Sequence, residues 1–111
     1  MRCDELGRLG EAAAAKWFTE HGYTVLFPLG DGASYDFAVD NGSGLLRVQV
    51  KSRASRDVRG RMRFELVRRQ HKRYDGIDLW ALYNAETDEV RVVTEEKRRG
   101  RVNIYWEDDD A

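Results

Sequence analysis

A carboxylate, an amide and an ammonium group are predicted to meet on one face of a hairpin formed by residues 35–51. Successive side chains of a strand point to opposite sides, so Asp36 of the first strand shares its face with Gln49 and Lys51 of the second. If the chain reverses about residues 42 and 43, Asp36 lies opposite Gln49 and roughly 7–8 Å from Lys51 on the diagonal. Such a set of groups could hold a divalent cation and a phosphate.

The opposite face of this hairpin is apolar, and its members are Tyr35, Phe37, Val39, Leu46, Val48 and Val50. A turn at Asn41 and Gly42 would shift the register by two residues and keep the same faces. The polar face also has a simpler explanation. Half-solvated antiparallel sheets alternate in this way, and Asp36 with Lys51 could be an ordinary cross-strand ion pair.

A further carboxylate, Glu11, belongs to a helix predicted over residues 4–21. Its neighbours one turn away are Gly7, Arg8, Ala14 and Ala15. Three of these four side chains are tiny, so a neighbouring strand could approach the carboxylate closely. Glycine inside a helix otherwise costs about 1 kcal/mol relative to alanine. The alternative is a glutamate that faces solvent, beside glycines that only let the helix pack tightly.

Together these groups are oxygen donors that suit a hard cation. Asp36 would contribute a carboxylate oxygen, Gln49 its amide oxygen and Val50 its backbone carbonyl, while Glu11 would hold a water molecule beside the metal. Lys51 would act as a point charge that lowers the pKa of the attacking water or neutralises charge on the phosphate in the transition state. We therefore expect metal-assisted chemistry at a phosphate.

The helix that carries Glu11 is predicted to be capped by Asp4 and stopped by Gly22. Helical spacing places its buried stripe at Leu6, Leu9, Ala13 and Trp17. Beyond the hairpin, further strands are predicted at residues 23–27, 62–66, 77–83 and 89–94.

Between these strands, residues 52–61 are expected to be mobile without a partner, and residues 67–74 to form a short basic helix. This order of elements indicates an α/β protein in which a mixed β-sheet is flanked by helices.

Composition sets the remaining limits. With 111 residues, of which 41% are hydrophobic, a single domain over residues 1–111 is expected. The lone cysteine, Cys3, excludes an intramolecular disulfide and gives no support to a zinc site or a Cys–His nucleophile. No apolar run is long enough for a signal peptide or a membrane span, so a soluble cytoplasmic protein is expected.

Positive charge is concentrated in the middle of the chain, although the formal net charge is only -1. Residues 47–73 hold eleven Lys or Arg against two acidic residues, whereas acidic residues prevail in residues 1–46 and 74–111. Fifteen arginines against four lysines favour bidentate contacts with phosphates. The pattern favours DNA as a partner over a merely solvated charged face. The predicted DNA-binding residues are Arg53, Arg56, Arg59, Arg61, Arg63, Arg68, Arg69, Lys72 and Arg73.

In the order of its motifs, most of the chain resembles the PD-(D/E)xK nuclease superfamily. The segment 7–11, Gly-Arg-Leu-Gly-Glu, is similar to the N-terminal helix motif of archaeal Holliday junction resolvases. The segments 35–37, 49–51 and 74–83 are similar to homing endonucleases associated with group I introns. Tyr35 stands where the motif has proline, and Gln49 where it usually has an acidic ligand, but the intron-associated family also uses Gln-x-Lys.

This resemblance implies a restriction endonuclease-like core and Mg²⁺-dependent hydrolysis of DNA phosphodiesters, with Mn²⁺ as a substitute. It implies that Asp36 is a metal ligand, Lys51 the catalytic lysine and Glu11 an accessory acid. Duplex and branched DNA both remain open as substrates. A different class of function also stays open: a non-catalytic DNA-binding or assembly module on a nuclease-like fold, in which Gln49 reflects loss of the metal.

A homodimer or higher homo-oligomer is expected, because one active site cuts one strand and so small a domain offers little surface to read a long site. The aromatic residues of the late segments are the predicted interface, with a place in the core as the alternative. They are Trp80, Tyr83, Tyr105 and Trp106.

Overall fold

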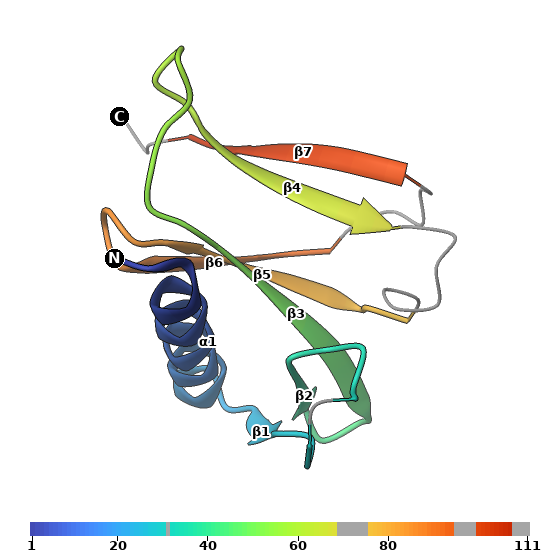
Figure 1. The fold of residues 1–111 in the computed structure, drawn as a ribbon. Helices are drawn as coiled ribbons and strands as arrows, with labels where there is room; N and C mark the ends of the chain where they lie inside the picture. The colour runs from blue at the N-terminus through green and yellow to red at the C-terminus, as the bar shows by residue number, and fades with distance from the viewer. Residues whose placement is uncertain (31, 69–75, 95–99, 108–111) are drawn as a thin grey trace.

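One helix and two β-sheets make up the part of the protein that the computed structural model describes, which is residues 1–30, 32–68, 76–94 and 100–107 (Figure 1). The elements in chain order are α1 (Cys3–Glu20), β1 (Thr24–Leu26), β2 (Phe37–Asp40), β3 (Leu45–Arg53), β4 (Met62–Arg68), β5 (Leu79–Asn84), β6 (Glu89–Val93) and β7 (Gly100–Trp106).

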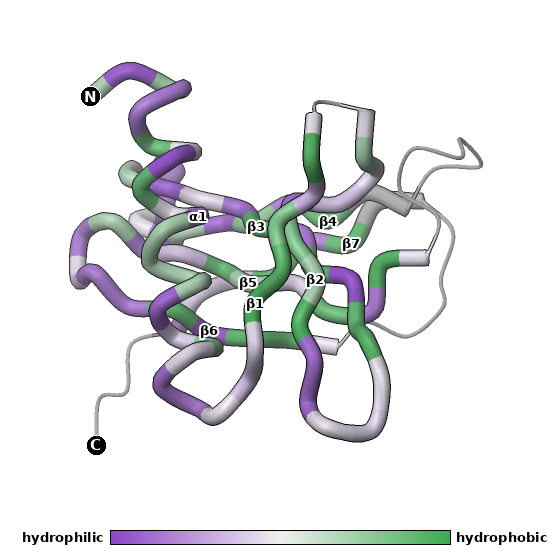
Figure 2. Tube along the Cα trace, turned by 90° about the horizontal axis from the view of Figure 1, so that it is seen from below, coloured by the Kyte–Doolittle hydropathy of each residue, from purple (hydrophilic) through white to green (hydrophobic). Residues whose placement is uncertain are grey.

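The larger sheet has five strands in the order β1-β2-β3-β5-β6, and it is mixed, because β3 and β5 run parallel while the other pairs are antiparallel. The smaller sheet is the antiparallel pair β4 and β7. The prediction of an α/β protein with a mixed sheet is confirmed. Figure 2 shows hydrophobic and hydrophilic residues interspersed along the chain, within strands as well as between them.

Two apolar clusters lie on the two faces of the larger sheet. On one face, Ala14 and Phe18 of α1 pack against Phe37, Val48 and Ala81 of the sheet. On the other face, every second side chain of β5 packs against strands β4 and β7. The buried members of this second cluster are Met62, Phe64, Leu66, Ile77, Trp80, Leu82 and Trp106. The larger sheet is thus covered by α1 on one side and by two strands on the other (Figure 1).

The predicted hairpin register is confirmed. Phe37 pairs with Val48 and Asp40 with Leu45, and the backbone N–H of Asn41 donates to the carbonyl of Gly44 at 3.4 Å. The chain therefore reverses about residues 42 and 43, where Gly42 has a φ of 94° that favours glycine.

The prediction for Tyr35 was wrong. Its ring packs against the cluster between the two sheets, on the face of Arg47, whose guanidinium carbon lies 5.6 Å from the ring centroid. The physical reason is that β2 begins only at Phe37, so the alternation of a regular strand does not extend back to Tyr35.

Helix α1 has its predicted extent, and Gly22 follows it with a φ of 86°. Asp4 does not cap it, because Arg2 occupies the N-cap position and Asp4 lies in the first turn. The buried stripe also differs from the prediction: it consists of Gly10, Ala14 and Phe18, whereas Leu9 is 41% exposed. Close packing of the helix on the sheet selects small side chains rather than the most apolar ones.

Two further expectations changed. Residues 67 and 68 belong to strand β4 rather than to a helix, and the rest of that predicted helix lies outside the described residues. Of the aromatic residues expected at an interface, Trp80, Tyr83 and Trp106 are buried in the core, and Tyr105 is only 37% exposed. No helix of the described residues is long and apolar enough to cross a membrane.

Candidate active site

Strand β3 presents Gln49 and Lys51 on the face that points away from α1, because Val48 and Val50 occupy the helix-facing side. The Lys51 ammonium lies 5.9 Å from the ring centroid of Trp80 on the neighbouring strand β5. Both Gln49 and Lys51 are half-buried. The shared polar face predicted for these two residues is therefore present.

Asp36 reaches β3 from the residue before β2. Its backbone N–H donates to the carbonyl of Val48 at 3.0 Å, and its Oδ2 accepts a hydrogen bond of 2.7 Å from the backbone N–H of Val50. Strand β2 pairs with β3 only as far as Val48, so the Val50 N–H would otherwise lack a partner on this side. The end of the strand pairing thus holds the carboxylate beside the segment from Gln49 to Lys51.

Electrostatics show that the two carboxylates lie near each other. Burial raises the pKa of Asp36, while the hydrogen bond from Val50 and the charge of Lys51 act in the opposite direction. Burial also raises the pKa of Glu11, and the negative charge of Asp36 raises it further. Asp36 is therefore within electrostatic reach of both Glu11 and Lys51.

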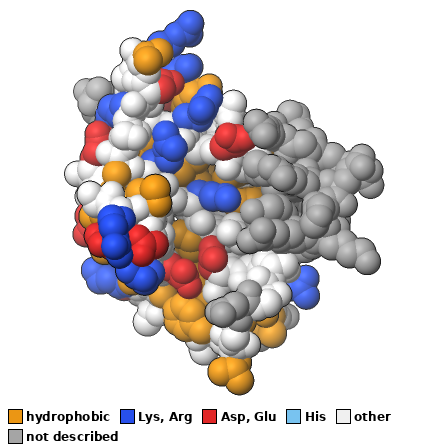
Figure 3. Space-filling model, in the orientation of Figure 1, with side chains coloured by type: hydrophobic (Ala, Val, Ile, Leu, Met, Phe, Trp, Pro, Cys, Tyr) orange, Lys and Arg blue, Asp and Glu red, His pale blue; other side chains and the backbone are white. Residues whose placement is uncertain are grey.

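A cavity of about 580 Å³ collects all of the predicted catalytic and metal-binding residues, since its lining includes Glu11, Asp36, Gln49, Val50 and Lys51. These residues come from three places in the sequence, namely α1, the start of the hairpin and β3. In Figure 3, basic and acidic side chains lie among one another from the top to the centre of the face shown. The cavity continues along β3 to its last residue, Arg53, and then into the following segment at Ala54 and Ser55.

The donor set fits a hard divalent cation. The described residues hold no cluster of three or more His, Cys, Asp or Glu side chains suited to a metal. The cavity instead combines two carboxylates with an amide oxygen and a backbone carbonyl, all of them oxygen ligands. The carboxylates of Glu11 and Asp36 are half-buried and have raised pKa values, so keeping both of them charged is unfavourable. A bound cation would offset this unfavourable free energy.

Helix α1 can bring Glu11 to this cavity because the preceding residue is glycine. A Cβ atom built on Gly10 would overlap the Ser52 hydroxyl and lie 3.1 Å from the Ser52 Cβ and 3.3 Å from the Tyr83 Cβ. Gly10 thus permits a close approach of α1 to strands β3 and β5, which is the tight packing that the sequence allowed for the helix glycines under either interpretation of Glu11. Gly7 differs, because a Cβ there would meet no atom within 4 Å.

A sequence model described as PD-(D/E)XK endonuclease matches residues 1–108 of the chain. The protein belongs to the PD-(D/E)XK endonuclease family. The structure is also similar to the solved structure of a bacterial homing endonuclease, I-Ssp6803I, with a TM-score of 0.72 and 24% sequence identity. The alignment covers 100% of this chain and 83% of that one, which confirms the restriction endonuclease-like fold. No curated protein matches the chain.

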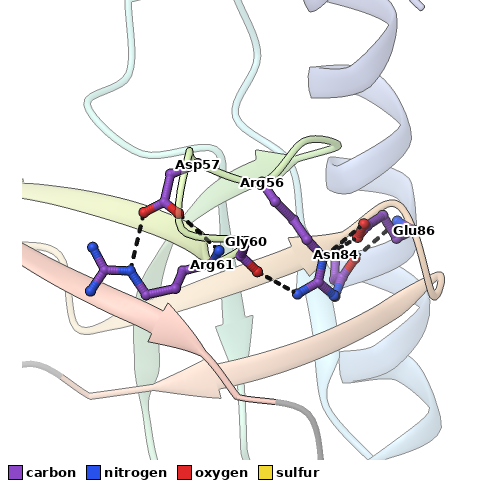
Figure 4. Close-up of polar contacts among 6 residues, drawn as sticks. All are labelled: Arg56, Asp57, Gly60, Arg61, Asn84 and Glu86. Atoms are coloured by element: carbon purple, nitrogen blue, oxygen red, sulfur yellow. Dashed lines mark hydrogen bonds and ion pairs between the residues drawn. The ribbon is translucent and has the colours of Figure 1, made fainter.

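The basic residues predicted to bind DNA fall into three groups. Arg53, Arg59 and Arg63 are exposed. Arg56 and Arg61 are held in ion pairs with Glu86 and Asp57, drawn in Figure 4. The other four fall where no side chain is described, at Arg68, Arg69, Lys72 and Arg73.

The sequence did not reveal the acidic residues that pair with Arg56 and Arg61. Asp57 had a local signal, because Asp-Val-Arg-Gly is a typical turn sequence in which aspartate accepts hydrogen bonds from the following backbone. Glu86 had none, since it lies 30 residues from Arg56 and only the fold brings the two together. Residues 52 and 53 belong to β3, and these contacts hold the segment that follows, whereas the sequence predicted that residues 52–61 are mobile without a partner.

Proposed function

We propose that the protein is a DNA endonuclease that hydrolyses phosphodiester bonds with a divalent cation, Mg²⁺ by preference and Mn²⁺ as a substitute. The observation that carries the proposal is the convergence of Glu11, Asp36, Gln49, Val50 and Lys51 on one cavity. Membership of the PD-(D/E)XK endonuclease family agrees with it.

In this proposal Asp36, Gln49 and the Val50 carbonyl hold the cation, and Glu11 completes the site through water. When bound, the cation supplies Lewis-acid stabilisation of the negative charge on the phosphate. The hydrogen bond from the Val50 N–H fixes the orientation of the Asp36 carboxylate. Lys51 places a positive charge beside the phosphate, where preorganised charges stabilise the transition state.

Glu11 is suited to accept a proton from the attacking water. Its pKa is raised by burial and by the charge of Asp36, and a base is most effective when its pKa approaches the working pH. The carboxylate of Glu11 would take this proton as the water oxygen forms its bond to phosphorus and the bond from phosphorus to the leaving DNA oxygen breaks, and that oxygen would take up a proton from solvent water. The half-buried walls of the cavity keep Glu11 and Lys51 in place while the reaction proceeds.

The test is cleavage of supercoiled plasmid by purified protein in magnesium, manganese or chelator. Asp36→Asn and Lys51→Ala are expected to abolish cleavage and to leave DNA binding largely intact. Asp40→Asn is the matched control: Asp40 lies in the same hairpin outside the cavity, and its bond to the Gly42 N–H can be kept by an amide oxygen. Binding without cleavage by the unmodified protein would instead identify a non-catalytic DNA-binding module.

We further propose duplex DNA as the substrate, in the manner of homing endonucleases. The support is the Gln49-x-Lys51 pattern together with the likeness to a bacterial homing endonuclease. The same assay should include a four-way DNA junction. Preferential cutting of the junction would assign a resolvase-type activity instead.

Pairing of two copies would supply a second active site for the second strand of a duplex. Because most of the expected aromatic residues are core residues, the proposed interface moves to the exposed apolar side chains near the edge strand β1, which are Leu26, Phe27, Leu29 and Leu45. Light scattering with and without DNA tests the proposal, with Leu29→Asp as the disrupting variant. A monomer under both conditions would leave nicking of one strand as the expected activity.

A further inference from the structure

The segment from Ala54 to Arg61, here called the 54–61 loop, connects the catalytic strand β3 to β4 and projects at the top of Figure 1. Its first residues line the same cavity as Lys51. Its start is anchored by a hydrogen bond of 2.9 Å from the Ala85 N–H to the carbonyl of Arg53. The loop therefore stands directly beside the proposed site of cleavage.

Arg56 fastens this loop to the turn between β5 and β6. Its Nε donates to both carboxylate oxygens of Glu86, at 3.0 and 2.9 Å, and its Nη1 donates to the carbonyl of Gly60 at 3.0 Å. Glu86 is itself held, because its backbone N–H donates to the side-chain oxygen of the buried Asn84 at 2.9 Å. Figure 4 shows this chain of contacts from β5 to the loop.

A second set of contacts closes the loop on itself. One oxygen of Asp57 accepts the backbone N–H groups of Arg59 and Arg61, each at 2.9 Å, and the other accepts the Arg61 Nε at 3.2 Å. The Arg61 guanidinium lies 4.2 Å from the ring centroid of Tyr105 on β7. Arg56 and Arg61 are thus engaged within the protein, and they shape the loop.

The tip of the loop differs from its base. The side chain of Val58 is fully exposed, and Arg59 beside it is exposed as well. Of the residues that the structure describes, none forms an ion pair with the Arg59 guanidinium. An apolar side chain and a cation are therefore presented together on a loop that is already ordered, which lowers the entropy lost on binding.

We propose that the 54–61 loop is a preformed DNA-reading loop whose tip residues, Val58 and Arg59, enter a groove beside the cleaved phosphate. This inference rests on the proposed endonuclease function. Arginine can bind guanine O6 and N7 or a phosphate, and an isopropyl group can contact a thymine methyl. Arg56 and Arg61 are then positioning residues rather than DNA contacts.

The first test measures binding of a duplex of about 40 base pairs with randomised central positions, in chelator, with sequencing of the bound fraction. Arg59→Ala should weaken binding about 5- to 150-fold if Arg59 contacts a base, and it should relax base preference at one position. If Arg59 contacts a phosphate, the salt slope should instead fall by about 0.9. Val58→Ala should weaken preference for thymine. The unfolding midpoints of both variants should stay unchanged, because these side chains are exposed.

The second test separates positioning from contact. If Arg56 touched DNA, Glu86→Gln would release it and tighten DNA binding. If Arg56 positions the loop instead, Glu86→Gln and Arg56→Gln should weaken DNA binding to a similar extent. The double variant Arg56→Glu with Glu86→Arg, which exchanges the two charges, should restore part of the DNA binding.

If the unmodified protein binds DNA and the Val58→Ala and Arg59→Ala variants both bind it equally well, the proposal that the 54–61 loop reads DNA is overturned. The proposed endonuclease function still stands in that case. Tighter binding by Glu86→Gln would overturn the positioning role of Arg56. Failure of the unmodified protein to bind any duplex would overturn the endonuclease function and the loop together.

Discussion

Replacing Gly10 by alanine is expected to destabilise the protein and to impair cleavage, although alanine is the better helix former. Removing a glycine from a helix interior gains about 1 kcal/mol. At this position the new Cβ would overlap the Ser52 hydroxyl and lie 3.1 Å from the Ser52 Cβ and 3.3 Å from the Tyr83 Cβ. The hydroxyl can rotate away, but both Cβ atoms are fixed by their strands, so α1 must shift outward. Overpacking of this kind costs roughly 1–3 kcal/mol.

The two effects together leave a net loss of about 0–2 kcal/mol, or a fall in Tm of up to roughly 15 °C for a domain of this size. Gly7→Ala is the matched control on the same helix, because its Cβ would meet no atom within 4 Å. It should gain about 0.5–1 kcal/mol. The difference in Tm between the two variants isolates the effect of the close approach.

Cleavage should respond more strongly than stability, because Glu11 follows Gly10 and Ser52 follows Lys51. An outward shift of α1 therefore separates the proposed base from the catalytic strand. Plasmid cleavage at 25 °C, where Gly10→Ala remains folded, measures this effect, and adding Ser52→Gly, which removes one of the two Cβ contacts, should restore part of the activity. If Gly10→Ala were as stable and as active as Gly7→Ala, the argument that glycine permits the assembly of the site would be refuted.

Three further outcomes are expected. Gln49→Glu should keep cleavage activity and bind the cation more tightly in a metal titration, whereas complete inactivity would show that the amide does more than hold a cation. Log affinity for DNA against log salt should fall with a slope of about -4.5 or steeper, as for roughly five or more phosphates, and reversing the charge of Arg53 and Arg59 should flatten it. The folded pKa values of Glu11 and Asp36 are raised above 4.5 and 3.8, so in chelator the contribution of these two groups to stability should be fully present below these values and be lost as pH rises through the raised ones. Asp36→Asn should therefore be more stable than the unmodified protein at neutral pH, and a lower urea midpoint would contradict this.

The hairpin was predictable because its determinants are local. Alternation fixes which side chains share a face, and the glycine-rich turn limits the register to two alternatives, of which the structure has the one that pairs Phe37 with Val48. The position of Asp36 beside Val50 followed from that register. The orientation of Tyr35 did not, because the sequence does not indicate that the strand begins one residue after Asp36.

The buried side of α1 illustrates a second limit. Apolar spacing favoured Leu9 and Trp17, but the surface in contact with the sheet is formed by Gly10, Ala14 and Phe18. Hydrophobicity ranks side chains by their transfer from water, whereas a helix that must lie close to two strands selects them by size. Contacts such as that of Arg56 with Glu86 depend on the parallel pairing of β3 with β5, which no local pattern encodes.

The candidate site is assembled where regular structure is interrupted. Pairing between β2 and β3 stops at Val48, and the next inward-facing N–H, that of Val50, takes the Asp36 carboxylate as its partner. Burial raises the pKa of both carboxylates, and the charge of Asp36 raises that of Glu11 further. The interruption brings two carboxylates and Lys51 to one cavity, and under the proposed function a cation and a phosphate bound there would offset their charges.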